Sequence, residues 1–243
     1  MPSNFSSKPS TRFIALACLF VVAIVAAADK APGRPDASAL KKLEPGVFDL
    51  RGITLNSARQ TVSFAAAVNM TSNLVEYVVV CDDGKTHESL LKTSIEPRDL
   101  HVAMLLIGAK GSPPQTATEA DQQKVLQGDR IRVRIEWTNK NGKTERVRAE
   151  ELIRNDQTKR PMKPGDWVYN GSWIFNGRFV AQTERSILSI IFDRDALMNS
   201  AHPQRGDDEI WFANTERIPK INHPVRVEIE LQPNDKQKPS AQE

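Results

Sequence analysis

The sequence contains little cysteine and little histidine. Its 243 residues include 2 cysteines and 4 histidines, and Cys18 lies within an apolar segment near the start of the chain. Cys81 is therefore the one thiol in the remainder, which excludes an intramolecular disulfide there and any cluster held by four thiolates. A chain of this size can bury a hydrophobic core large enough to fold without such cross-links.

Long apolar runs are also scarce, and the one present covers residues 13–28, directly after Lys8 and Arg12. As a helix this run would be about 24 Å long, which is shorter than the hydrocarbon core of a bilayer at about 30 Å. It ends in three alanines, the small-residue pattern of a cleavage site. We therefore expect a signal peptide over 1–28 and a protein that is periplasmic or secreted after cleavage. The alternative is an uncleaved N-terminal anchor, and this segment is the only membrane contact that we expect.

The chain lacks an excess of charge of one sign. It has 33 basic and 30 acidic residues, a formal net charge of +3. Cleavage after residue 28 would remove Lys8 and Arg12 and no acid, which leaves the mature chain near neutrality. The basicity of the full chain therefore carries no message about nucleic acid, and we expect no nucleic-acid partner.

Composition divides the rest of the chain into three parts. Residues 29–45 are rich in alanine, proline and charge and are predicted to form a linker, and the polar residues 232–243 are predicted to form a disordered tail. Between them, residues 46–231 are predicted to form a single domain in which apolar residues recur with a period of two. The clearest case is 130–137, where apolar and charged residues alternate as in a strand with one buried face.

One helix is predicted at 97–108. Pro97 suits a first helical position, Asp99 suits the first turn and Gly108 suits the exit. The residues between them are apolar on every side of the helix axis, which predicts burial on every side. Strands otherwise dominate and no βαβ alternation is present. The sequence thus predicts an α+β fold, with a mainly antiparallel sheet, one central buried helix and one or two short helices.

Several short patterns resemble those of the YdjY domain family. They are GKTHESLL at 84–91, DLHVAMLLIG at 99–108, WVYNGS at 167–172, DAL at 195–197 and DDEIW at 207–211. The resemblance covers roughly residues 45–231 and implies an exported bacterial protein whose biochemical function is not established. Some members of the family are labelled iron–sulfur or ferredoxin-like, a label that the lone Cys81 does not fit.

His87 and His101 lie close together in the sequence and form the first candidate site. If the strands around the 82–85 turn pair and the helix covers them, both imidazoles converge with a carboxylate from Glu88 or Asp83, a donor set suited to zinc. Neighbouring strand residues point to opposite faces, however, so His87 and Glu88 should not both bind one ion. A metal site, an acid–base pair, and a buried structural histidine beside a surface ion pair all remain open.

Five arginines form the second candidate site, because they lie on one face of the predicted hairpin over 130–149. They are Arg130, Arg132, Arg134, Arg146 and Arg148. Clustered guanidinium groups can bind an anionic glycan, phosphate or lipid headgroup. The alternative is a solvated charged face, in which Glu136, Glu145 and Glu150 offset the arginines.

Four aromatic residues, Trp167, Tyr169, Trp173 and Phe175, alternate along the chain. Aromatic side chains on one face can form a ligand platform, although they more often fill the core of a small sheet.

No complete catalytic constellation and no nucleotide-binding loop is present, and we expect no cofactor. The sequence therefore favours a non-enzymatic binding or interaction module, whose partner is an envelope protein or an anionic glycan or ligand. The alternative is an envelope metalloprotein or enzyme that uses His87, Glu88 and His101.

Overall fold

The computed structural model describes residues 39–112 and 126–233. The predicted signal peptide over 1–28, residues 29–38 of the predicted linker and residues 234–243 of the predicted tail lie outside these residues. No helix in the described part is long and apolar enough to cross a membrane.

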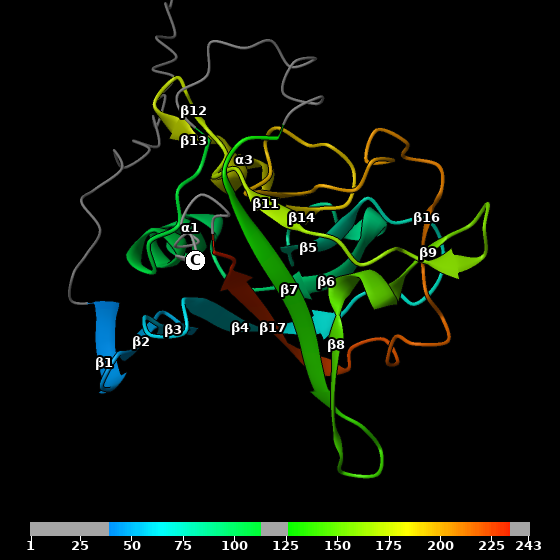
Figure 1. The fold of residues 1–243 in the computed structure, drawn as a ribbon, viewed down its shortest axis with the longest axis horizontal. Coiled ribbons are helices and arrows are strands. Elements are labelled where there is room, and N and C mark those ends of the chain that lie inside the picture. Colours follow the sequence, from blue (N-terminus) through cyan, green and yellow to red (C-terminus); the bar gives the residue numbers. More distant parts are fainter. Residues whose placement is uncertain (1–38, 113–125, 234–243) are drawn as a thin grey trace, which may run out of the picture. The chain divides into compact units, whose positions relative to one another are not determined.

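The fold is a closed barrel of eight strands with short helices at its margins (Figure 1). Around the barrel the strands are β4 (Thr61–Val68), β17 (Pro224–Leu231), β7 (Asp129–Thr138), β11 (Trp167–Tyr169), β15 (Met198–Ser200), β14 (Ser186–Ser189), β5 (Tyr77–Cys81) and β6 (Ser89–Thr93). Strand β6 pairs back onto β4 and closes the circle. The predicted α+β class is wrong, because strand (42%) far exceeds helix (13%) and the barrel itself forms the core.

The sheet extends beyond the barrel in two places, next to β4 and next to β7. Strands β1 (Leu40–Glu44), β2 (Val47–Leu50) and β3 (Ile53–Asn56) form a meander that leads into β4. Strand β1 thus begins within the predicted linker over 29–45. Strand β8 (Thr144–Arg148) pairs with β7, which confirms the hairpin that the alternating sequence predicts.

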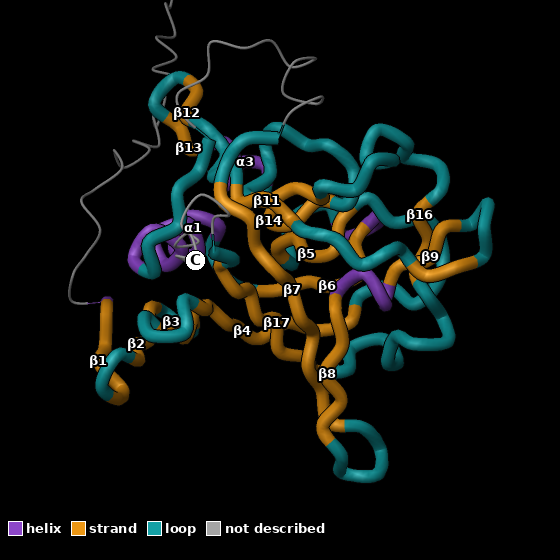
Figure 2. Tube along the Cα trace, in the orientation of Figure 1, coloured by secondary structure: helices purple, strands orange, loops and turns teal. Residues whose placement is uncertain are grey.

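Two smaller sheets lie outside this one (Figure 2). One contains β10 (Arg160–Pro161), β9 (Ile153–Asn155) and β16 (Trp211–Ala213), and the other contains β12 (Ile174–Phe175) and β13 (Arg178–Phe179). The short helices are η2 (Thr86–Glu88), η3 (Ala149–Leu152) and α3 (Val180–Glu184).

Helix α1 (Pro97–Leu106) forms where the sequence predicts a helix, and Gly108 follows it with a φ of +94°. It is not a central helix. Leu100, Ala103 and Met104 are fully buried, whereas Leu105 and Leu106 are 50% and 52% exposed. The helix packs against β3 and α3 at the margin of the barrel, so only one side of it reaches the core.

Strand β7 shows how the barrel is stabilised. Ile131, Val133 and Ile135 point inward and are fully buried, while the charged residues between them lie on the outer face. Each such side chain contributes about 1.5–3 kcal/mol when it leaves water. The same alternation leaves a continuous outer surface of charged residues on β7, β8 and β17.

Candidate functional site

The predicted histidine cluster does not assemble. His87 lies on η2 with 79% of its side chain exposed, and its Nε2 is 3.7 Å from Glu88 Oε2. Asp83 instead accepts a hydrogen bond from Arg185 Nε at 2.6 Å. Across residues 39–112 and 126–233, no three His, Cys, Asp or Glu side chains are grouped so that they could hold a metal ion.

His101 has a different environment, on α1 beside strand β11. Its Nδ1 is 2.7 Å from the Tyr169 hydroxyl, and its ring centroid is 4.9 Å from that of Phe179. Burial lowers the pKa of His101 and raises the pKa of Tyr169. The hydrogen bond between the imidazole and the hydroxyl joins the helix to the barrel.

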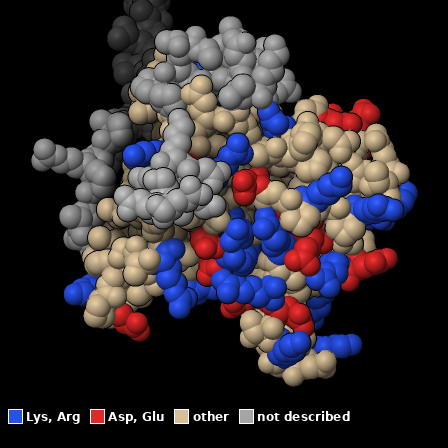
Figure 3. Space-filling model, in the orientation of Figure 1, with Lys and Arg blue, Asp and Glu red and all other residues tan. Residues whose placement is uncertain are grey.

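The predicted arginine face exists, but acidic side chains of β17 neutralise much of its charge. The sequence analysis did not place this strand beside the hairpin. Glu228 and Glu230 of β17 lie opposite Arg134 and Arg132 of β7. Arg132 Nη1 is 3.5 Å from Glu230 Oε2, Arg134 Nη1 is 3.5 Å from Glu228 Oε1 and donates to Glu230, and Arg146 donates to Glu228. Figure 3 shows acidic and basic side chains interleaved over this face.

The two remaining arginines do not pair with β17. Arg148 Nη2 is 2.7 Å from Glu150 Oε1, and Glu150 is only 1% exposed. The same guanidinium also donates to the carbonyl oxygen of Gly165. Arg130 is exposed, and none of the described carboxylates forms an ion pair with it.

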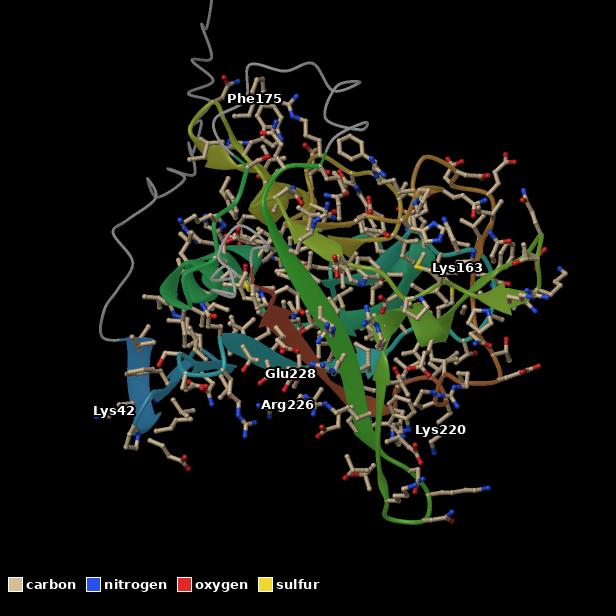
Figure 4. All side chains as sticks on the ribbon, viewed as in Figure 1. Lys42, Lys163, Phe175, Lys220, Arg226 and Glu228 are labelled. Atoms are coloured by element: carbon tan, nitrogen blue, oxygen red, sulfur yellow. The ribbon has the colours of Figure 1, made fainter. Side chains whose placement is uncertain are left out.

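The aromatic run divides between core and surface. Trp167 and Tyr169 are 1% and 0% exposed, so this pair packs inside the barrel. Trp173 lies at the surface, where the Arg194 guanidinium covers its ring at 3.9 Å and its Nε1 donates to Asp195 at 2.7 Å. Phe175, labelled in Figure 4, is 56% exposed. The four residues therefore do not form one platform.

A cleft that the sequence analysis did not predict lies between the three-stranded sheet of β10, β9 and β16 and the loop that precedes β16. Its volume is about 800 Å³. Arg160 of β10, Lys163 and His202 line it, together with the buried side chains of Met162 and Trp211. We call this hollow the basic cleft. Lys163 marks its position in Figure 4.

The cations of the basic cleft are not neutralised as those of the arginine face are. Within the described ranges, no carboxylate forms an ion pair with Arg160 or Lys163, and both side chains are exposed. Asp166 also lines the cleft. Burial, together with the nearby Lys163 ammonium, lowers the pKa of His202.

The His202 ring is held by two contacts. Its Nδ1 accepts a hydrogen bond from the Gln204 backbone N–H at 3.2 Å, and its ring meets that of Trp211 edge-on at 4.9 Å between centroids. The neutral ring therefore carries its proton on Nε2.

A family model of the YdjY domain matches residues 53–230. The chain belongs to the YdjY domain family. No curated protein and no solved structure matches it.

Two of the motifs that carry the YdjY resemblance contribute one residue each, Lys85 and Asp195, to a second, smaller hollow of about 360 Å³. Lys85 Nζ donates to the Tyr77 hydroxyl at 2.9 Å, and that hydroxyl donates to Asp193 Oδ2 at 2.8 Å. Lys85 Nζ also lies 3.7 Å from Asp193 Oδ2. These charges neutralise one another, so the hollow has no unpaired charge for a ligand among these three groups.

The basic cleft, by contrast, contains only one residue from those YdjY motifs, Trp211 of the DDEIW pattern. A local signal for it did exist, since Lys159, Arg160 and Lys163 form a short basic run. Sequence reasoning missed the cleft because His202 and Trp211 reach it from a distant part of the chain.

Proposed function

We propose that this YdjY-domain protein is an exported, non-enzymatic binding protein whose basic cleft takes a small anionic ligand. One observation carries the proposal: Arg160 and Lys163 line a cleft without a described carboxylate to neutralise them. Their charges are available to a ligand, because no internal ion pair among the described residues has to be broken first.

The dimensions and the lining of the cleft support this function. A volume of about 800 Å³ lies within the range of roughly 300–1,000 Å³ that is usual for small-molecule sites. Met162 and Trp211 supply apolar surface, and Asn155, Thr158 and Gln204 supply polar groups around the cations. Such a site suits an organic acid, for example an acidic sugar, with its carboxylate near the cations and its hydroxyls near the polar groups.

The arginine face supports the same choice by contrast. An anion that binds there competes with Glu228 and Glu230, which already hold Arg132, Arg134 and Arg146. The alternative of an enzyme or metalloprotein receives no comparable support, because His87 and His101 have separate partners.

Calorimetry with D-glucuronate as the probe tests the binding function. We expect glucuronate to bind and neutral glucose to bind much more weakly, since only glucuronate brings a charge for the cations. Lys163→Gln should weaken glucuronate binding about tenfold, the loss of one charge-assisted contact. Lys220→Gln is the matched control, because Lys220 is exposed and does not line the basic cleft. Equal binding of both sugars, or equal effects of both variants, would contradict the proposal.

Export is tested independently by expressing the full chain in a bacterial host and fractionating the cells. We expect periplasmic or secreted protein whose first residue is Asp29, as measured by intact mass. Full-length protein in the cytosol would contradict this part of the proposal.

A further inference from the structure

His202 is a titratable side chain that lines the basic cleft. The hydrogen bond that its ring accepts depends on the protonation state of the ring. Its Nδ1 accepts the Gln204 backbone N–H, so the neutral ring presents a proton on Nε2. No described group accepts that Nε2 proton. Charging the ring adds a proton at Nδ1, which removes the acceptor from the Gln204 N–H and sets two donors against each other.

The positively charged groups around the ring oppose its protonation when no anion is bound. Lys163 and Arg160 line the same cleft, and the Arg205 guanidinium donates to the His202 carbonyl oxygen at 3.3 Å. Asp166 is the one acid among the lining residues. The pKa of His202 is lowered by burial and then by Lys163.

An anion in the cleft reverses this balance. It offsets the positive charge of Lys163 and Arg160, and it accepts a hydrogen bond from His202 Nε2, which is stronger when the ring is charged. Binding of the anion and protonation of His202 therefore favour each other, and thermodynamic linkage makes the effect reciprocal.

We propose that the basic cleft binds an oxyanion, a carboxylate or sulfate-type group, together with uptake of a proton by His202. This rests on the proposed binding function and adds its regulation, because the affinity then depends on pH. An exported protein that works this way holds its ligand more tightly in an acidic medium than in a neutral one.

Binding measured as a function of pH tests this inference. Sulfate and D-glucuronate serve as probes, since both stay ionised from about pH 5 to pH 8 and differ as an inorganic ion and an organic acid. We expect the affinity for the probe that binds to rise about tenfold on acidification over this range, equivalent to a one-unit rise in the pKa of His202. Calorimetry in buffers of different ionisation enthalpy should show proton uptake on binding.

Two variants identify the group that titrates. His202→Asn places an amide oxygen near the Nδ1 position, so it can still accept the Gln204 N–H, but it cannot titrate. We expect it to abolish the pH dependence. His87→Asn is the control, because His87 is 79% exposed and does not line the cleft.

The results separate the two proposals. Binding that does not depend on pH, or a pH dependence that persists in His202→Asn, overturns the inference and leaves the binding function standing. No binding of either probe overturns both. If His202→Asn fails to fold, the His202 ring resonance of the unmodified protein is titrated by NMR with and without the probe, and a pKa that the probe does not raise overturns the inference.

Discussion

The outer face of β7, β8 and β17 and the basic cleft both contain several cations, but the two regions balance them differently. On the barrel face, Arg132, Arg134 and Arg146 lie beside Glu228 and Glu230. In the cleft, Arg160 and Lys163 have no such partner among the described residues. A count of basic residues along the chain would select the barrel face as the ligand site. The pairing of charges in space instead favours the cleft as that site.

The difference teaches that a cluster of arginines indicates a binding site only when its neighbours across the sheet are known. On a sheet, charges of opposite sign on adjacent strands stabilise the fold through cross-strand pairs. Cations without such pairs add little to stability and are free to contact a ligand. The predictions below test this division of roles, beginning with the largest effect expected.

Arg148→Gln should be the most destabilising change among these cations. It leaves the carboxylate of Glu150, which is 1% exposed, without its cation. Removing one partner of a buried ion pair costs about 3–5 kcal/mol. We expect the free energy of unfolding in urea to fall by about 3 kcal/mol.

The double variant Arg148→Met with Glu150→Leu is the control, since it removes both charges and should recover most of that loss. Arg148 also donates to the carbonyl oxygen of Gly165, a lining residue of the cleft. Arg148→Gln should therefore weaken glucuronate binding as well. A stable Arg148→Gln protein would mean that the barrel face does not depend on its ion pairs.

Replacing both Glu228 and Glu230 by Gln should have a smaller effect. Their carboxylates are 25% and 30% exposed, so water screens the ion pairs that are lost. We expect a loss of about 1–2 kcal/mol in low salt and less in high salt. The matched change in the cleft, Arg160→Gln with Lys163→Gln, should alter stability by less than about 0.5 kcal/mol. Equal losses in the two double variants would contradict the contrast between the regions.

Acidification should destabilise the protein through two histidines. Burial lowers the pKa of both His101 and His202. Between these lowered values and the ordinary value of about 6.5, the unfolded chain binds more protons than the folded chain. The free energy of unfolding that depends on the two histidines is therefore fully present above about pH 6.5 and is lost as the pH falls. We expect a loss of about 1 kcal/mol per pH unit for each histidine that is neutral when folded and charged when unfolded.

Sulfate distinguishes the two histidines in this measurement. It should restore stability lost at His202, which lines the cleft, and not that lost at His101, whose Nδ1 faces the Tyr169 hydroxyl. Stability that does not fall on acidification would contradict this prediction.

Local patterns in the sequence predicted local structure well. The alternation over 130–137 and the turn after it gave the β7–β8 hairpin, and the signals at Pro97 and Gly108 located α1. They could not predict closure of the barrel, because β4 and β6 meet through two residue pairs at Val68 and its neighbour. The predicted fold class was wrong because it rested on an apolar helix as the core, whereas the closed sheet forms the core.

The site was less predictable than the hairpin. Glu228 and Glu230 lie on one face of β17, as their alternation indicates, but nothing local shows that this strand lies beside β7. The basic cleft combines residues near Arg160 with His202 and Trp211, and no periodic pattern links these segments. Family resemblance did not help, because only one residue of its motifs, Trp211, lines the basic cleft.

The smallest expected effect comes from Arg130, the one predicted face residue that forms no ion pair with a described carboxylate. Arg130→Gln should change the free energy of unfolding by less than about 0.5 kcal/mol, as is usual for an exposed position. Arg134→Gln, two residues along the same strand, should be measurably more destabilising because Arg134 contacts both Glu228 and Glu230. Urea unfolding of the two variants in low salt measures this difference, and both substitutions remove one positive charge. If the two losses are equal, pairing with β17 does not decide which cations stabilise the barrel, and unpaired cations can no longer be used to locate the ligand site.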